Sequence, residues 1–89
     1  MSVYHDNVTL GTAAVEIVPA WSGPQYVMLH NMTKSSNEYI YVGGSGVTDA
    51  NSIHIDPGEN LNFQLPPGDS LYALSDPDGL EVGILAMRR

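Results

Sequence analysis

Three histidines are the residues of this chain best suited to bind a transition metal. His5, His30 and His54 are spread along the sequence, so they lack the close spacing that a zinc or iron site needs within one strand or turn. The spacing predicts no metal site within a single chain. It leaves open that histidines of several copies meet on a symmetry axis.

A second candidate is the acidic pair Asp76 and Asp78, which Gly79 follows as in the first part of a calcium loop. Such a loop needs a further oxygen ligand two residues on and a carboxylate at its end that binds through both oxygens. Leu80 occupies the next position. The match stops there, and we expect no calcium site.

The glycine-rich segment at residues 43–46 encloses Ser45. A phosphate-binding loop needs a following Gly-Lys-Ser/Thr and a helix, and a hydrolase nucleophile needs a sharp strand-to-helix turn. No helical pattern follows this segment, which favours a bulge and a wide turn after a strand. We therefore expect no enzyme activity and no cofactor.

The elements that position these residues are short strands. Apolar residues alternate with polar ones through residues 53–74, and two turn sequences interrupt them, Asp-Pro-Gly-Glu at 56–59 and Pro-Pro-Gly-Asp at 66–69. Alternation at period two indicates half-buried strands, and each Pro-Gly pair favours a tight reversal. The pattern predicts a meander of antiparallel strands. The fold class expected is all-β, a small antiparallel β-sandwich or jelly-roll-like barrel of about seven or eight short strands.

Domain organisation follows from length and pattern. Residues 1–6 show no strong alternation and are expected to form a flexible N-terminal arm, and residues 7–89 are expected to form a single domain. The runs at 7–10 and 14–18 form either one bent strand or two. The longest alternating run, at 80–87, predicts a strand in the centre of a sheet.

Aromatic residues are the candidates for an interface. Tyr26 and Met28 alternate with aliphatic residues in one predicted strand, and Tyr39 and Tyr41 do so in the next. If these strands pair, the four side chains share a face suited to another subunit, although tyrosines also tolerate the wet face of a sandwich. Trp21, in a proline-bounded loop, is either a lid on the core or an anchor. The predicted interface residues are Val3, Tyr4, His5, Trp21, Tyr26, Met28, Tyr39 and Tyr41.

Charge restricts the partners. The net charge is −7, and Lys34, Arg88 and Arg89 are the cations that offset ten carboxylates. Nucleic acid and anionic membranes both need basic residues, so neither is expected as a partner. The start of the chain lacks the basic and apolar regions of a signal peptide, which predicts a protein made in the cytoplasm. A domain of 89 residues without cysteine is expected to gain stability by self-association.

Several segments together resemble the small β-sandwich head decoration, or cement, proteins of tailed bacteriophages. They are Val-Thr-Leu at 8–10, Ala-Val-Glu-Ile-Val at 14–18, Tyr-Val-Met-Leu-His-Asn at 26–31, Ile-Tyr-Val-Gly-Gly-Ser-Gly-Val-Thr at 40–48, Ile-Asp-Pro-Gly-Glu at 55–59 and Leu-Tyr-Ala-Leu at 71–74. The resemblance implies a virion structural protein on the capsid exterior, made in the bacterial host cytoplasm. It also implies a homotrimer that binds the major capsid protein and stabilises the capsid.

Two alternatives accompany that expectation. Related domains occur in phage tail and fibre proteins, and Trp21 with the tyrosines would also suit a carbohydrate-binding module. An enzyme is the third and least favoured class, because the sequence offers no catalytic set of residues.

Overall fold

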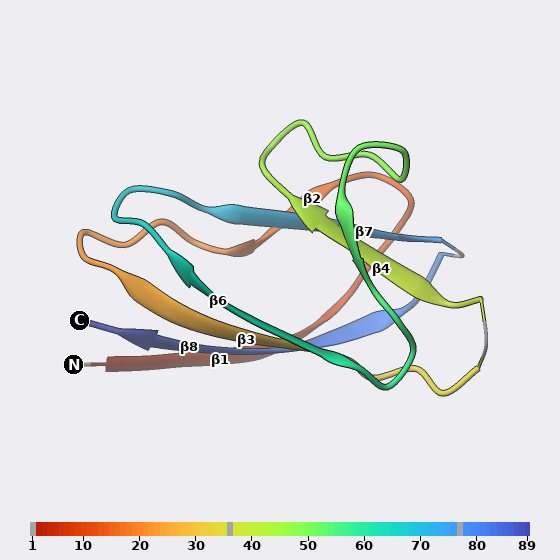
Figure 1. Cartoon of the computed structure of the whole chain (residues 1–89), viewed down its shortest axis with the longest axis horizontal. Helices are drawn as coiled ribbons and strands as arrows, with labels where there is room; N and C mark the ends of the chain where they lie inside the picture. The colour runs from red at the N-terminus through yellow and green to blue at the C-terminus, as the bar shows by residue number, and fades with distance from the viewer. Residues whose placement is uncertain (1, 36, 77) are drawn as a thin grey trace.

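The computed structural model describes residues 2–35, 37–76 and 78–89 of the chain, and every regular element in them is a β-strand (Figure 1). This confirms the expected all-β class and strand number. The eight strands are β1 (Ser2–Thr9), β2 (Val15–Val18), β3 (Gln25–Asn31), β4 (Tyr39–Gly43), β5 (Ile53–Ile55), β6 (Asn60–Leu65), β7 (Leu71–Asp76) and β8 (Glu81–Arg88).

The strands form two antiparallel sheets of four. Sheet A has the order β1-β8-β3-β6, and sheet B has the order β2-β7-β4-β5. Each of the first four strands pairs with one of the last four, as β1·β8, β2·β7, β3·β6 and β4·β5. The chain is thus one long hairpin rolled into two layers, which is the jelly-roll arrangement.

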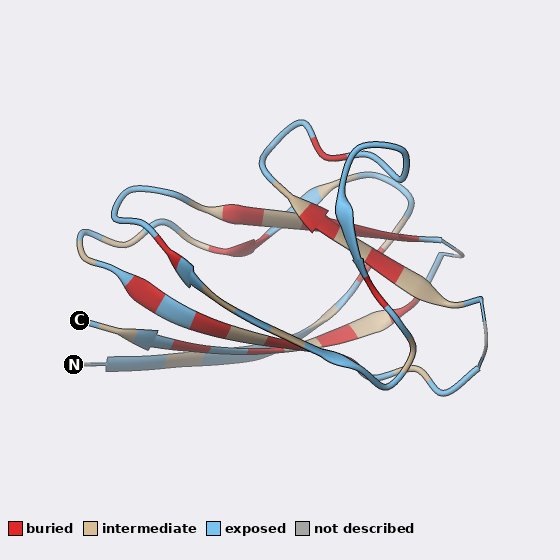
Figure 2. Cartoon of the chain, in the orientation of Figure 1, coloured by how far each residue is buried: buried red, intermediate tan, exposed pale blue. Residues whose placement is uncertain are grey.

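Alternation in the sequence becomes alternation in burial. In β3, Val27 and Leu29 are buried while Tyr26 and His30 are exposed, and β4 has the same pattern about buried Ile40. Figure 2 shows the buried positions recurring along strands of both layers. The core is therefore built from the inward-facing residues of the two sheets, as expected where antiparallel sheets stack.

The meander expected through residues 53–74 is wrong. The turns exist, because Gly58 and Gly68 have φ of 75° and 83°, a conformation that glycine adopts without strain. Yet β5, β6 and β7 lie in sheets B, A and B, so each turn carries the chain across to the other layer. A reversal fixes the direction of the next strand and leaves open which strand it pairs with.

The flexible arm expected at residues 1–6 is also wrong for the residues described. β1 pairs with β8 along its whole length, from Ser2 opposite Arg88 to Thr9 opposite Glu81. Tyr4 packs against the core from this strand. Main-chain hydrogen bonds and one inward-facing ring therefore hold the segment. Met1 lies outside the described residues.

The runs at residues 7–10 and 14–18 belong to separate strands in different sheets. Between them the backbone of Leu10 is fixed on both sides: its N–H donates to the carbonyl of Leu80 at 2.7 Å, and its carbonyl accepts from the N–H of Gly79 at 2.8 Å. The long predicted strand at 80–87 is confirmed as an inner strand of sheet A.

Asn31, at the end of β3, is a fully buried polar side chain. Its Nδ2 donates to the carbonyl oxygens of Glu38 and Ile55, each at 2.9 Å, and its Oδ1 accepts from the N–H of Thr33 at 3.1 Å. Because Ile55 belongs to β5, one amide links sheet A to sheet B and to the loop between β3 and β4. Buried polar groups are retained where all their hydrogen bonds are made.

We predict that Asn31→Ala lowers the free energy of unfolding by about 2–4 kcal/mol, because it removes the amide that donates to the buried Ile55 carbonyl and accepts from the Thr33 N–H. Urea denaturation followed by circular dichroism measures this loss. The control is Asn62→Ala, at an exposed position of β6, which should change stability by less than about 0.5 kcal/mol. Equal losses in the two variants would contradict a bridging role for Asn31.

Candidate interaction surface

The predicted face that combines Tyr26, Met28, Tyr39 and Tyr41 does not form. β3 lies in sheet A, whereas β4 pairs with β5 and β7 in sheet B. The two pairs of side chains therefore lie on the opposite outer surfaces of the sandwich. Sequence reasoning paired β3 with β4 because they are neighbours in the chain.

The outer surface of sheet A instead brings together residues from four strands. The registers align three rows, each crossing β1, β8, β3 and β6 in that order. We call these twelve residues face A. Row 1 is Val3, Met87, Tyr26 and Gln64; row 2 is His5, Leu85, Met28 and Asn62; row 3 is Asn7, Gly83, His30 and Asn60.

Face A is partly apolar and lacks the residue types that carry a fixed charge. None of its residues is Asp, Glu, Lys or Arg, although the chain has ten carboxylates. Its large apolar side chains are accessible: Val3 is 59% exposed, Tyr26 41%, and Leu85 and Met87 37% each. Charged residues are depleted in the centres of protein interfaces, and contiguous exposed apolar residues commonly mark them. Face A is therefore the candidate interaction surface.

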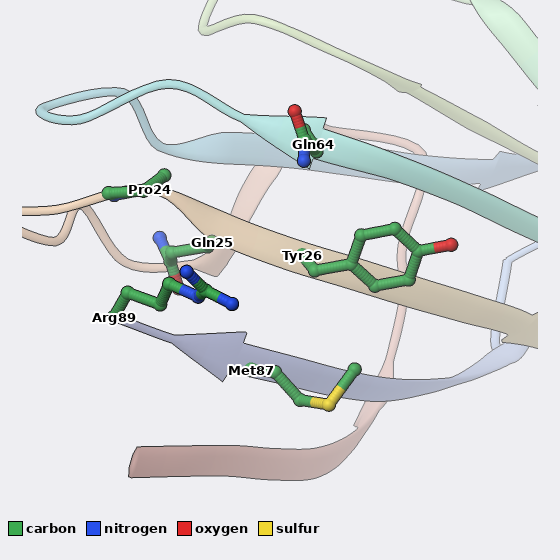
Figure 3. Close-up of a pocket in the computed structure, with 6 residues that line it drawn as sticks. All are labelled: Pro24, Gln25, Tyr26, Gln64, Met87 and Arg89. Carbon is green, nitrogen blue, oxygen red and sulfur yellow. The ribbon is translucent and has the colours of Figure 1, made fainter. Parts of the chain in front are cut away.

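Face A has a hollow at each end. Near row 1, a groove of about 530 Å³ is lined by Pro24, Gln25, Tyr26, Gln64, Met87 and Arg89. Figure 3 shows Tyr26 and Met87 on neighbouring strands, with Gln64 on the next strand. At row 3, a second hollow of about 340 Å³ surrounds Gly83 and is bordered by Met28, His30 and Met32. The Met32 side chain lies beside Gly83, with its Sδ 3.4 Å from the position that a Cβ of Gly83 would take.

The outer surface of sheet B has a different character. The His54 ring contacts those of Tyr39 and Tyr41 edge-on, with centroids 5.4 and 6.4 Å away, and His54 Nε2 lies 3.1 Å from Asp56 Oδ1. Burial, and then the nearby carboxylate of Asp76, raise the pKa of Tyr41 above the usual tyrosine value. Carboxylates thus border the tyrosines here, in contrast to face A.

Tyr4 and Trp21 enclose Arg88 at the end of the sandwich. The Arg88 guanidinium carbon lies 4.6 Å from the ring centre of Tyr4 and 4.8 Å from that of Trp21. Arg88 Nε donates to Oε1 of buried Gln25 at 2.9 Å, and Gln25 Nε2 donates to the Pro19 carbonyl at 2.9 Å. We call this group the arginine clamp. Trp21 therefore covers one end of the sandwich, and Tyr4 faces inward.

The predicted interface residues thus separate into three places. Val3, His5, Tyr26 and Met28 share face A; Tyr39 and Tyr41 lie on sheet B; Tyr4 and Trp21 belong to the arginine clamp. Sequence reasoning missed Leu85 and Met87 on the β8 strand of face A. Their signal was present as the outward half of the long alternating run at 80–87.

Two further features bear on chemistry. Among the described residues, no three His, Asp or Glu side chains lie close enough together to hold a metal ion. The same part of the chain has no helix long and apolar enough to cross a membrane. The expected absences of a cofactor, an enzyme activity and a nucleic-acid or membrane partner stay predictions.

Comparison with known proteins gives a likeness of fold. The sequence matches no family model and no curated protein sequence. A solved structure of Bacillus endospore appendages, described as a novel family of disulfide-linked pili, is similar with a TM-score of 0.51 at 19% identity. The match covers 96% of this chain and 83% of that chain.

This likeness overturns the functional expectation drawn from the sequence. The expectation of a bacteriophage head decoration protein is wrong, since the solved structure that the chain resembles forms endospore pili. The resemblance had been carried by turns and strand ends, which jelly rolls of different function have in common. The expected capsid partner and virion location depended on the same resemblance.

We predict that Arg88→Met lowers the free energy of unfolding by about 1–3 kcal/mol, because it removes two cation–π contacts and leaves Gln25 Oε1 without its donor. Urea denaturation followed by the fluorescence of Trp21, the single tryptophan, measures the loss. Lys34→Met, which removes an exposed cation, is the matched control. A loss no larger than that of the control would show that the clamp adds no stability.

Proposed function

We propose that this protein is a structural subunit that associates with copies of itself through face A. The observation that carries the proposal is the exclusion of charge from face A. A surface position of this chain is more often acidic than basic, because ten carboxylates accompany three cations. A second copy can approach face A without bringing carboxylates together, which would be costly elsewhere on the surface.

The size of face A suggests how strong a single contact is. With strands about 4.8 Å apart and a rise of about 3.4 Å per residue, three rows of four cover roughly 400 Å² per copy. This is about half the area per partner of a standard interface. If half of it is apolar, burial on both copies contributes about 10 kcal/mol. Since association costs about 4–15 kcal/mol, one such contact is weak.

Weak contacts suit a protein that is used in many copies, because linked contacts strengthen one another. The fold likeness to an endospore appendage described as a pilus supports a role in a repeating assembly. That appendage is described as disulfide-linked, whereas this chain has no cysteine. Contacts between copies of the given sequence therefore involve no disulfide. The trimer expected from the sequence stays a prediction.

We predict that Leu85→Glu weakens self-association at least tenfold, because it places a carboxylate at the middle of face A on both copies. Sedimentation velocity over a range of concentrations measures the effect. The side chain points outward, so the melting temperature should stay close to that of the parent.

Ser45→Glu adds the same charge at an exposed loop position and serves as the control, which should associate as the parent does. If both variants associate like the parent, face A is not the contact. If the parent stays monomeric at millimolar concentration, the proposed function itself is wrong.

A further inference from the structure

Face A has no Asp, Glu, Lys or Arg in its three rows, but among the described residues one charged side chain lies beyond each end. Along β8, outward positions alternate with buried ones, which places Glu81 one step beyond row 3. One step beyond row 1 lies Arg89, which lines the groove with Tyr26 and Met87. Neither Glu81 nor Arg89 forms an ion pair with another described residue. An acidic side chain thus lies beyond one end of face A and a basic side chain beyond the other.

We propose that two copies pack face A against face A with their strands antiparallel. The two-fold axis lies in the plane between the two faces and runs perpendicular to the strands. The inference rests on the proposed function and names the arrangement of the partner copy. In it, row 2 lies on row 2 of the partner, and row 1 of each copy lies on row 3 of the other. Such a contact uses the same surface on both copies and closes on itself as a dimer, so a repeating assembly needs a further contact outside face A.

Charge at the ends selects this arrangement. Two copies can face each other with rows in the same order or in reversed order. The same order brings Arg89 near Arg89 and Glu81 near Glu81, and both contacts are repulsive. Reversed order brings each Arg89 to the Glu81 of the other copy. Two ion pairs then form at the borders of an otherwise uncharged contact.

The middle of the contact is apolar in either copy. Leu85 and Met28 lie in row 2 on the two inner strands of sheet A, so they meet their own counterparts at the axis. Stacked sheets lie about 10 Å apart with strand directions within about 30° of each other. At that separation, side chains of this size from both copies interdigitate.

The test is a charge exchange between Arg89 and Glu81. Arg89→Glu alone and Glu81→Arg alone should each weaken dimerisation about three- to tenfold, because each replaces two attractive pairs by repulsive ones. The double variant Arg89→Glu/Glu81→Arg should return to within about twofold of the parent. Dissociation constants come from sedimentation equilibrium at low salt, and the effects of the single variants should shrink as salt screens the pairs.

Matched controls separate this effect from net charge. Lys34→Glu changes the charge by as much as Arg89→Glu, and Glu16→Arg by as much as Glu81→Arg, both at exposed positions outside face A. Each control should dimerise within about twofold of the parent.

The outcomes distinguish this inference from the proposed function. If the parent dimerises but the single variants match their controls, the antiparallel arrangement is wrong while self-association stands. If the single variants weaken dimerisation and the double variant does not recover, the pairing of Arg89 with Glu81 is wrong. A parent that never associates would overturn both proposals.

Discussion

The simultaneous pairing of β8 with β1 and β3 is the interaction on which the rest of this structure depends. One strand supplies both surfaces of sheet A. Its inward residues Val82, Ile84 and Ala86 are buried in the core, while Leu85 and Met87 lie on face A. A slip of one residue in either pairing would exchange these two sets. Core and interaction surface are therefore fixed by the same register.

The lack of acidic and basic residues on face A contrasts with the strongly acidic composition of the whole chain. A net charge of −7 keeps separate copies apart through long-range repulsion. Face A is a local exception that offers apolar contact at short range. In the proposed association, the two effects together favour contact in one orientation over indiscriminate aggregation, and the charged side chains beyond the ends of face A sharpen that choice.

Most strands and turns were predictable from the sequence, but which strands pair with one another was not. Alternation at period two identified the strands, and the Pro-Gly pairs identified the turns that contain Gly58 and Gly68. Neither signal says which strand is a neighbour. Face A combines residues as distant in sequence as His5 and Leu85, so its composition emerges only from the rolled hairpin. The arginine clamp could not be predicted for the same reason. The contact of Arg88 with Tyr4 depends on the pairing of β1 with β8, which the sequence pattern does not specify.

Both ends of the described chain emerge side by side, because Ser2 lies opposite Arg88 (Figure 1). A pulling force applied through these ends would act across the β1·β8 ladder and open its hydrogen bonds one after another, as a zipper opens. The arginine clamp lies at the point where this opening begins, so it is the first group to bear the load. A force transmitted through face A would instead press on the broad side of sheet A. An assembly joined through face A would thus load its subunits across the sheet and not along the direction that opens β1·β8 one hydrogen bond after another.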